Sequence, residues 1–402
     1  MPAEPSPRVA IIGAGIGGLT AALACRAAKL EVDIYEQATV LTEAGAGIQL
    51  SPNATRILRA FGLLEQVYAR SFVPRAARFR AARSGYVIAH MPLGSLGEAR
   101  YGAPYLHIHR DDLHQVLRQA AEDAGARLHL GKRFQSFRRE GASVQTQFED
   151  GSDAWCELLI GADGIKSRVQ AALFGEQSPR FTGHMVWRGL VQADDVPENL
   201  IEPAVTAWLG PARHFVHYYV RGGQEINFVG VVETERWTEE SWSIDGDPEE
   251  MRRDFQDWHP DVQQLISRST SCFKWALYDR PPLERWSVGR VTLLGDACHP
   301  MRPFLAQGAA MAIEDAWVLG RFLDTYETEV EQALTEYEYY RRPRTAIVQR
   351  RSIEQGRMYH ERSRSAQLMR NFKLAAGTRL VPDIAMQQYD WLFGYDAIKG
   401  FD

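Results

Sequence analysis

Cysteine is scarce in this chain of 402 residues, which has four cysteines at positions far apart and no Cys-x-x-Cys pair. That pattern excludes a disulfide-stapled scaffold and a zinc ribbon, and it is typical of a protein from a reducing compartment. Charge of one sign is not in excess either, since 46 basic residues against 51 acidic residues give a net charge of −5. We therefore expect no basic surface for nucleic acid.

Long hydrophobic runs are also missing. The longest, residues 9–25, is too short to span a bilayer and contains four glycines. Residues 1–8 have three prolines and no hydrophobic stretch of the kind that a secretory signal needs. We therefore expect a cytoplasmic protein with no membrane span. With 45% apolar and 24% charged residues the chain is globular, and its length favours two domains or one α/β domain with an insertion.

What the chain does have is glycine at the ends of predicted strands. Near the N-terminus an apolar run suited to a buried parallel strand precedes a predicted helix. Between them, Gly13, Gly15 and Gly18 fit the G-x-G-x-x-G pattern, which turns tightly and brings a helix N-terminus to a pyrophosphate. A second apolar strand ends at Glu36, where an acid is expected to meet an adenosine ribose. This order predicts a bound dinucleotide, either FAD or NAD.

Two later strand ends carry an aspartate beside a glycine. The turn at Asp163 suits contacts with pyrophosphate and ribose groups. Asp296 can accept hydrogen bonds from a ribitol-type hydroxyl, while a helix that begins near Gly308 would point its positive end at a ring that becomes anionic on reduction. Reduced flavin is such a ring, so this last junction favours FAD.

In their order and spacing the three junctions resemble those of the group A flavoprotein monooxygenases, the aromatic hydroxylases of the para-hydroxybenzoate hydroxylase superfamily. The branch that contains salicylate hydroxylase and 6-hydroxynicotinate 3-monooxygenase is the most similar. The similarity covers essentially the whole chain and includes residues 45–49, 108–113, 295–307 and 391–396.

The resemblance implies bound FAD, NADH or NADPH as co-substrate, and O₂, from which one oxygen atom is inserted into an aromatic ring by way of a flavin C4a-hydroperoxide. It also implies which residues hold the cofactor. The ADP half would contact Gly13, Gly15, Gly18 and Glu36. The remainder would contact Arg110 at the pyrophosphate or ribitol, Asp296 at the ribitol, and Gly47, Gln307, Gly308 and Ala309 at the ring. Pro303 and the helix N-terminus at Gly308 would support the reduced ring.

The substrate is expected to bind in residues 181–274, a segment of different composition. It is rich in aromatic residues and valine, which alternate as they do in strands. Within it, alternation places His214 and Tyr218 on one strand face. Histidine titrates near neutral pH and can take a phenolic proton, which makes the ring more electron-rich. Both residues also resemble polar active-site residues of the 6-hydroxynicotinate branch. We therefore predict His214 and Tyr218 as catalytic residues, together with Pro303.

The substrate itself is less well defined, because three pocket positions depart from the 6-hydroxynicotinate branch. Gln49 and Phe304 stand where that branch has histidines, and Ala204 stands where it has a cysteine. These changes predict a more apolar pocket and a different or less polar aromatic. We expect a hydroxybenzoate, a hydroxypyridine or a related phenol or N-heteroarene, with or without loss of a carboxylate.

The expected fold class is α/β: a Rossmann-like FAD-binding domain, an inserted, mainly antiparallel substrate-binding sheet, and a C-terminal helical segment. The FAD-binding domain would comprise residues 8–71, 102–178 and 281–350. The substrate-binding domain would comprise residues 72–101 and 179–280, and the helical segment residues 351–402. Both a monomer and a homodimer are compatible with the sequence.

Other interpretations stay open. A flavin monooxygenase that epoxidises or hydroxylates a non-phenolic polycycle would need no base, and a non-catalytic redox module would bind the nucleotide alone. The intact Asp-Gly and Gly-Asp junctions argue against the module. We expect no metal, because His107-x-His109 has no third ligand at a recognised spacing. The charges of residues 327–364 are interpreted as the solvated face of amphipathic helices with a break or a kink at Pro343.

Overall fold

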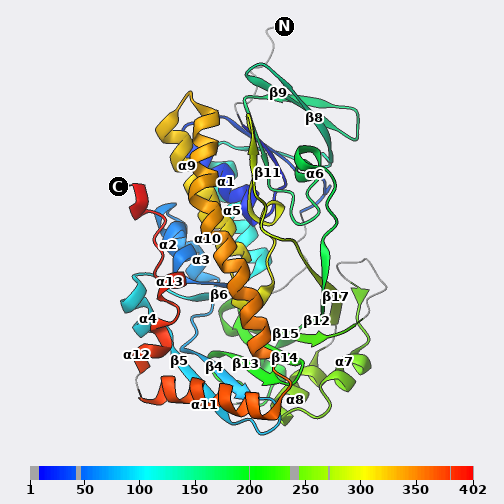
Figure 1. The fold of residues 1–402 in the computed structure, drawn as a ribbon, viewed down its shortest axis with the longest axis vertical. Coiled ribbons are helices and arrows are strands. Elements are labelled where there is room, and N and C mark those ends of the chain that lie inside the picture. Colours follow the sequence, from blue (N-terminus) through cyan, green and yellow to red (C-terminus); the bar gives the residue numbers. More distant parts are fainter. Residues whose placement is uncertain are drawn as a thin grey trace.

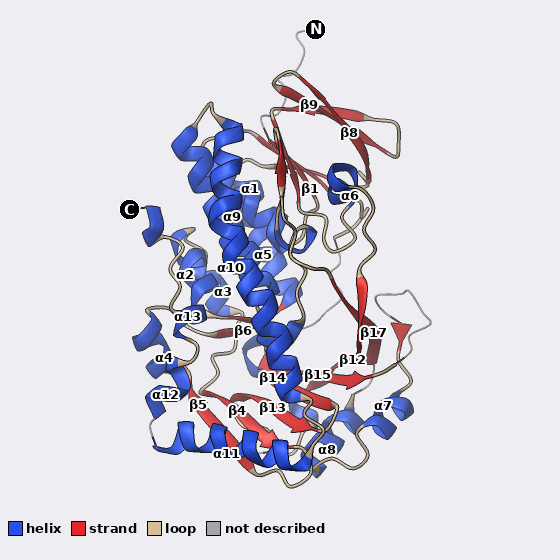
Figure 2. Ribbon diagram, viewed as in Figure 1, coloured by secondary structure: helices blue, strands red, loops and turns tan. Residues whose placement is uncertain are grey.

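The structure is a computed structural model and describes residues 9–41, 47–198, 200–235, 244–269, 272–380 and 382–401. Residues 1–8 and the Gly45-Ala46 part of the motif at 45–49 lie outside these ranges. Within the ranges, no helix combines the length and the apolar character that crossing a membrane requires. Parallel and antiparallel sheets are combined with helices, which confirms the predicted α/β fold class (Figures 1 and 2).

The first sheet lies in the upper part of Figure 1. Its strands are β1 (Val9–Ile12), β2 (Val32–Tyr35), β7 (Arg127–His129), β11 (Leu158–Gly161), β18 (Ser287–Val288) and β19 (Val291–Leu293), in the order β18-β19-β11-β1-β2-β7. β1 pairs in parallel with β11 and β2. Every residue of β1 is buried, as expected for an apolar run in a parallel sheet covered on both faces.

The second sheet lies in the lower part of Figure 1. Its strands are β4 (Ala76–Ala81), β5 (Val87–Pro92), β12 (Arg180–Gln192), β13 (Ala204–Gly210), β14 (Arg213–Val220), β15 (Glu225–Glu233), β16 (Ile244–Asp245) and β17 (Cys272–Asp279). Their order is β16-β17-β12-β15-β14-β13-β4-β5, and neighbours are antiparallel except β13 and β4. This is the antiparallel sheet that the aromatic segment predicts, although β4 and β5 come from far earlier in the chain. The proposed domain boundaries stay a prediction.

Two smaller sheets complete the strand structure of the described residues. One contains β8 (Phe134–Glu140), β9 (Ser143–Phe148) and β10 (Asp153–Cys156). The other pairs β3 (Gly47–Leu50) with β6 (Leu106–His109) in antiparallel register, so that Gly47 lies opposite His109.

The helices bind these sheets together. The helices that precede β12 in the chain are α1 (Ile16–Ala27), α2 (Pro52–Ala60), α3 (Leu64–Ala69), α4 (Gly94–Tyr101), α5 (Arg110–Asp123) and α6 (Arg168–Phe174). The helices that follow β12 are α7 (Pro248–Asp254), α8 (Pro260–Arg268), α9 (Gly308–Tyr326), α10 (Val330–Tyr359), α11 (Arg364–Leu380), α12 (Pro382–Gln387) and α13 (Asp390–Phe393). In Figure 1, α10 runs from the first sheet to the second, and α11 lies across the second sheet.

The helix α10 continues through Pro343, so the break, one of the two alternatives expected there, is absent. A second expectation for this region is wrong. Arg341 does not belong to a solvated face: its side chain is 0% exposed, and it pairs with Glu314 at 2.7 Å and Asp315 at 2.8 Å on α9. Buried guanidinium and carboxylate groups are tolerated because each neutralises the other in hydrogen-bonded geometry. This ion network joins α9 to α10.

Candidate active site

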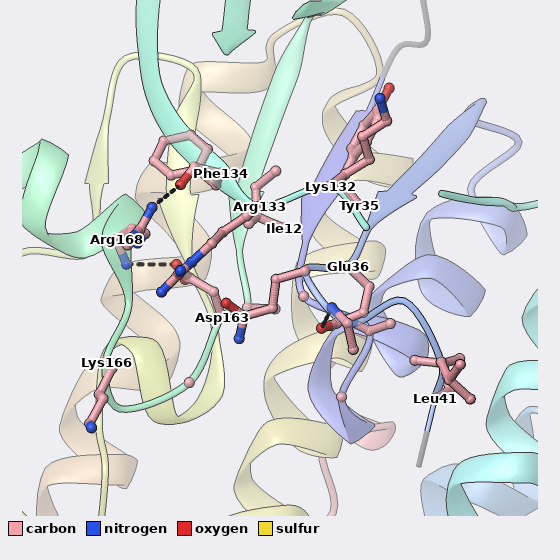
Figure 3. A pocket seen from close by; sticks show the side chains of 18 of the residues that line it. Ile12, Tyr35, Glu36, Leu41, Lys132, Arg133, Phe134, Asp163, Lys166 and Arg168 are labelled. Atoms are coloured by element: carbon pink, nitrogen blue, oxygen red, sulfur yellow. Dashed lines mark hydrogen bonds between the residues drawn. The ribbon is translucent and has the colours of Figure 1, made fainter. Parts of the chain in front are cut away.

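A cavity of about 350 Å³ lies at the carboxyl ends of β1, β2 and β11. Two of the three predicted junctions contribute to it, together with Glu36: Gly13 and Gly15 follow β1, Asp163 follows β11, and Glu36 follows β2. The carboxyl ends of parallel strands meet at one edge of a sheet, which is where open α/β folds bind their ligands. We refer to this space as the cofactor cavity. Figure 3 shows Glu36 and Asp163 at its wall.

The glycines of the first junction meet three different steric demands. Gly13 has a φ of +103°, which side chains rarely adopt. A Cβ atom on Gly18 would lie 1.9 Å from the carbonyl oxygen of Gly13, so the loop and α1 could not approach as they do. A Cβ atom on Gly15 would meet nothing within 4 Å. Because Gly15 lines the cavity at the start of α1, this free space suits a phosphate group at a helix N-terminus.

The two acids of the cofactor cavity also hold its loops. The Glu36 carboxylate accepts hydrogen bonds from the N–H groups of Ala14 at 2.8 Å and Ala38 at 2.9 Å. The Asp163 carboxylate accepts from the Ser167 hydroxyl at 2.5 Å and from the N–H of Arg168 at 2.7 Å. Burial raises the pKa of Asp163, and these hydrogen bonds oppose that rise. Both acids are therefore fixed at the cavity wall before any ligand binds.

Positive side chains surround the same cavity, and the sequence reasoning missed most of them. Lys132 and Arg133 precede β8, while Lys166 and Arg168 follow Asp163 (Figure 3). Cations beside a helix N-terminus are suited to the negative charges of a pyrophosphate. Arg168 belongs to the turn at Asp163 that the sequence predicts at the pyrophosphate, whereas the basic pair Lys132-Arg133 just after β7 lies outside any recognised motif.

Asp296 lies at the third junction, beside the start of α9. A Cβ atom on Gly308 would be 4.0 Å from Asp296 Oδ1. The Asp296 side chain is accessible to solvent, yet burial raises its pKa, against the charges of His299 and Arg110. Asp296 therefore combines solvent access with desolvation beside the start of α9, and the charge of Arg110 acts on it. A ribitol contact at this position stays a prediction.

The other predicted ring-side residues connect the two sheets. The Gln307 side chain donates to Ser51 Oγ at 2.8 Å and accepts from Asn53 at 3.1 Å, which fixes the start of α9 against the turn between β3 and α2. Ala309 is half-buried in the first turn of α9. The N–H of Gly47 donates to Asn227 Oδ1 at 2.8 Å, and a Cβ atom there would lie 2.6 Å from the Tyr218 ring. Gly47 therefore allows β3 to touch the second sheet.

A second cavity, of about 110 Å³, lies between the second sheet, the turn before α9 and the C-terminal helices. We refer to it as the substrate cavity. Four predicted residues line it: Gln49, His214, Pro303 and Phe304. Ala204 does not, because Val205 and Ala207 of β13 face the cavity and strand alternation turns Ala204 to the opposite face. The resemblance marked Ala204 as a pocket residue, but the lining contains its neighbour Val205 instead.

Tyr218 also lies outside the lining of the substrate cavity, although it shares a strand face with His214. It is buried against His107, with the ring centroids 4.7 Å apart. Burial raises the pKa of Tyr218, and a hydrogen bond to Gln49 opposes that rise. Gln49 in turn accepts a hydrogen bond from the Tyr105 hydroxyl at 2.7 Å. The placement makes Tyr218 a support for Gln49 rather than a group in the cavity.

The sequence reasoning missed the one arginine that lines the substrate cavity, Arg78 of β4. Its guanidinium pairs with Glu202, whose side chain is 54% exposed. Its Nε atom is buried and has no hydrogen-bond partner in the described part of the chain. A buried donor without a partner is costly unless a ligand meets it. The cavity is therefore less apolar than Phe304 alone would make it.

The C-terminal segment forms the remaining wall of the substrate cavity. Gln355 and Tyr359 come from the end of α10, and Tyr389 and Phe393 from the region of α13. The sequence marked residues 391–396 by resemblance and gave no geometric reason for it. Because these side chains come from positions far from β14 in the chain, no local pattern could place them beside His214.

His214 is buried in this wall and hydrogen-bonded to another histidine. Its Nδ1 lies 2.6 Å from Nε2 of His360, the residue that ends α10. Burial, followed by the neighbouring His360 and His184, lowers the pKa of His214 well below its ordinary value. The imidazole is therefore neutral at neutral pH. One nitrogen is engaged by His360, which leaves Nε2 as the atom that a ligand in the cavity would use.

Together the fold and its two cavities define a dinucleotide-dependent α/β protein with an adjoining pocket for a small ligand. The sequence profile of the FAD binding domain family matches residues 7–352, and the chain belongs to that family. The cofactor cavity fits the ADP half of FAD, because Gly15 leaves free space at the start of α1 and Lys132, Arg133, Lys166 and Arg168 line the same cavity.

Relatives and solved structures agree with this family. The chain is 40% identical to 3-amino-4-hydroxybenzoate 2-monooxygenase PtnB3 of Streptomyces platensis, over 97% of this chain and 96% of that protein. It is 38% identical to 6-hydroxynicotinate 3-monooxygenase of Pseudomonas fluorescens, over 86% and 90%. HpxO of Klebsiella pneumoniae, solved with FAD and uric acid, superposes with a TM-score of 0.84 at 27% identity, over 96% and 97%. A salicylate hydroxylase substrate complex superposes with a TM-score of 0.82 at 25% identity, over 98% and 96%.

Proposed function

We propose that this protein is an FAD-dependent monooxygenase that hydroxylates a single aromatic ring bearing an ionisable hydroxyl, with NADH or NADPH and O₂ as co-substrates. One observation carries the proposal: a neutral, hydrogen-bonded histidine lines a small aromatic-walled cavity next to the turn that begins α9. The names of the relatives, which act on hydroxylated benzoates and a hydroxynicotinate, support the same reaction class.

FAD, when bound, supplies the redox chemistry and the transfer of oxygen. The chain supplies binding, orientation and exclusion of water. The N-terminus of α9 at Gly308 lies beside Asp296, and its positive end would stabilise negative charge on a reduced ring bound there. Pro303 lies in the turn just before α9 and lines the substrate cavity.

His214 has the environment of a base for a phenolic proton. Burial keeps its imidazole neutral, and the bond to His360 fixes the orientation of its ring. We assign it to orient and deprotonate the ring hydroxyl at Nε2. In a His214→Ala variant that still binds FAD, we expect hydroxylation to fall on the order of 10²-fold. Unchanged rates and an unchanged pH profile would remove His214 from the mechanism.

The substrate cavity is small, about 110 Å³, and this favours a single-ring substrate over a polycycle. Arg78 adds a charge preference: its buried Nε and its position in the lining suit a carboxylate on the ring. We therefore place hydroxybenzoates and hydroxypyridine carboxylates first among the candidate substrates.

The decisive experiment uses the FAD-loaded protein. Hydroxybenzoates, hydroxypyridines, their decarboxylated analogues and bicyclic phenols are screened for stimulated oxidation of NADH and NADPH, with the product identified by mass. We expect a mass increase of one oxygen for at least one single-ring phenol. Oxidation without product, or activity confined to rings with no ionisable group, would refute the proposal. A protein that cannot be loaded with FAD would refute it as well.

We further propose that the protein works in the cytoplasm, as a monomer or a homodimer. All four cysteines are free and buried, which suits a reducing compartment. Both cavities are lined by residues of a single chain, so a monomer has the groups that the reaction requires.

A further inference from the structure

A row of hydrogen-bonded side chains leads from the substrate cavity to the surface. The reaction proposed above uses only the first of them, His214. His214 Nδ1 lies 2.6 Å from His360 Nε2. On the other side of the same ring, His360 Nδ1 lies 3.2 Å from Glu233 Oε1. The second carboxylate oxygen of Glu233 accepts from Nε of Arg362 at 3.1 Å. His214 and His360 are buried, whereas the Arg362 side chain is 71% exposed.

The hydrogen atoms along this row can be assigned in one consistent way. Glu233 is an acceptor, so His360 Nδ1 carries a hydrogen and donates to it. His360 Nε2 is then the acceptor for a hydrogen on His214 Nδ1. That leaves His214 Nε2 with a lone pair, on the ring that lines the substrate cavity. Every donor therefore points away from the cavity and toward the surface.

Neither histidine can store a proton. Burial and the two neighbouring histidines lower the pKa of His214 well below its ordinary value. Burial, and then the neighbouring His184, lower the pKa of His360 to about 4, although Glu233 opposes this. A base that cannot remain charged passes a proton on as it accepts one. At the far end, burial disfavours ionisation of Glu233, but Arg362 and His360 outweigh it and lower its pKa.

We propose that His360 and Glu233, held by Arg362, form a proton path between His214 and the surface. The inference rests on the proposed function, since a phenolic substrate is the source of the proton. The first O–H bond broken is that of the ring hydroxyl, and its proton binds His214 Nε2. The Nδ1 hydrogen of His214 moves to His360 Nε2, and the Nδ1 hydrogen of His360 moves to Glu233, which releases it to water. When the hydroxylated product regains its hydroxyl proton, the same path runs in reverse and restores both histidines.

The other charged groups around the path are accounted for. His184 of β12 packs on His360 with ring centroids 5.2 Å apart, and its Nδ1 is hydrogen-bonded to Thr182. Arg302, which precedes the turn at Pro303, pairs with Asp279 of β17 at 2.8 Å. Tyr359 packs on His214 with ring centroids 5.0 Å apart. None of these groups interrupts the two hydrogen bonds of His360.

His184, Glu233 and His360 also lie close enough to suggest a metal site, since their ligand atoms are within 4.8 Å of one another. Two observations favour the proton path. Both ring nitrogens of His360 are engaged in hydrogen bonds, and the Glu233 charge is already balanced by Arg362. A divalent cation would have to break these bonds and face a guanidinium.

The test measures proton transfer apart from turnover. FAD-loaded protein is mixed with 4-hydroxy-3-nitrobenzoate, whose phenolate absorbs in the visible, in weakly buffered solution with a pH indicator. The pH is low enough that the free probe keeps its phenolic proton. For the wild type we expect the bound probe to ionise and one proton to appear in solution. In His360→Phe and His360→Gln we expect ionisation and proton release to slow on the order of 10-fold or more, with probe affinity within about threefold. Glu233→Gln is expected to delay proton release more than ionisation.

The matched control is His184→Gln, which removes a histidine that touches the His360 ring and leaves both its hydrogen bonds in place. We expect wild-type rates for this variant. His360→Gln retains polar character, so a folding defect confined to the phenylalanine variant does not remove the test. Wild-type ionisation rates in both His360 variants would overturn the path, as would a chelator-sensitive rate restored by added Zn²⁺ or Fe²⁺. If the wild-type enzyme neither ionised nor hydroxylated any phenol, the proposed function itself would fail.

Discussion

The two cavities are built in opposite ways. The cofactor cavity is made at the ends of neighbouring parallel strands by backbone turns, and its acids are held by hydrogen bonds to loop N–H groups. The substrate cavity is made by side chains from β4, β13, β14, the turn before α9 and the C-terminal helices. A backbone-built site depends on glycines at fixed spacing, whereas a side-chain-built site depends on packing between distant segments.

The difference explains why one site tolerates little change in its loops while the other can be retuned. A glycine loop that fits a pyrophosphate must keep its shape in every member of a family. Substrate-cavity side chains can be exchanged one at a time, and relatives named for different aromatic substrates share 38 to 40% identity with this chain. The predictions below test where this contrast holds, starting where the two halves of the molecule join.

The largest expected effect is on stability, at the buried ion network between α9 and α10. Arg341→Met would leave the carboxylates of Glu314 and Asp315 without their shared guanidinium. We expect a loss of about 3 to 5 kcal/mol in the free energy of unfolding, measured by chemical denaturation of the FAD-loaded protein. The control is Arg351→Gln on the same helix, whose pair with Glu354 is exposed and should contribute at most about 1 kcal/mol. Equal losses in the two variants would contradict the prediction.

The second-largest expected effect is a difference between alanine substitutions at two glycines of the same loop, Gly18 and Gly15. Gly18→Ala places a Cβ atom 1.9 Å from the Gly13 oxygen, so we expect both a loss of about 1 to 3 kcal/mol in stability and a loss of bound FAD. Gly15→Ala meets no protein atom within 4 Å, so the apoprotein should keep its Tm while FAD binding weakens. Thermal unfolding with and without FAD, and the flavin absorbance after gel filtration, distinguish the two. Matching behaviour would mean that Gly15 does not face the cofactor.

The contrast between the cavities also describes what the sequence could predict. Local patterns located Gly13, Gly18 and Glu36 because strand, turn and helix follow one another along the chain. Alternation along β14 placed His214 and Tyr218 on one strand face, and the resemblance favoured that face; of the two, His214 lines the substrate cavity. The resemblance also marked Ala204, but strand alternation brings Val205 into the lining instead.

Other parts of the site had no local signal at all. Arg78 and His360 approach His214 only after β4, β13 and the end of α10 have packed together. Arg341 resembled a solvated charge because its partners lie on another helix, at Glu314 and Asp315. Such residues become visible only once long-range contacts are known.

A smaller effect is expected from the charge in the substrate cavity. Arg78→Gln removes the one guanidinium of the lining and keeps a hydrogen-bond donor. Losing a charge-assisted bond of about 1.5 kcal/mol corresponds to roughly a tenfold rise in KM for a hydroxybenzoate. The matched phenol without a carboxylate should show no such rise. A similar KM change for both compounds would show that Arg78 supports the cavity without contacting the substrate.

The smallest expected effect concerns pH and a histidine with no catalytic assignment. His217 is buried on the face of β14 opposite His214, and neither of its ring nitrogens has a hydrogen-bond partner in the described chain. Burial, and then the charge of Arg80, lower the pKa of His217 to about 3. An unfolded histidine titrates near about 6.5, so below that pH the unfolded chain binds a proton that the native chain does not. The free energy of unfolding therefore decreases as the pH decreases, by up to about 1.4 kcal/mol per pH unit for this residue.

Replacing His217 by leucine should remove that contribution and leave the rest of the acid transition unchanged. We expect His217→Leu to gain stability relative to the wild type as the pH falls from about 6.5 toward about 4, with a constant difference above pH 7. Denaturation curves at several pH values measure the difference directly. Parallel pH curves for variant and wild type would show instead that His217 takes up a proton in the native protein.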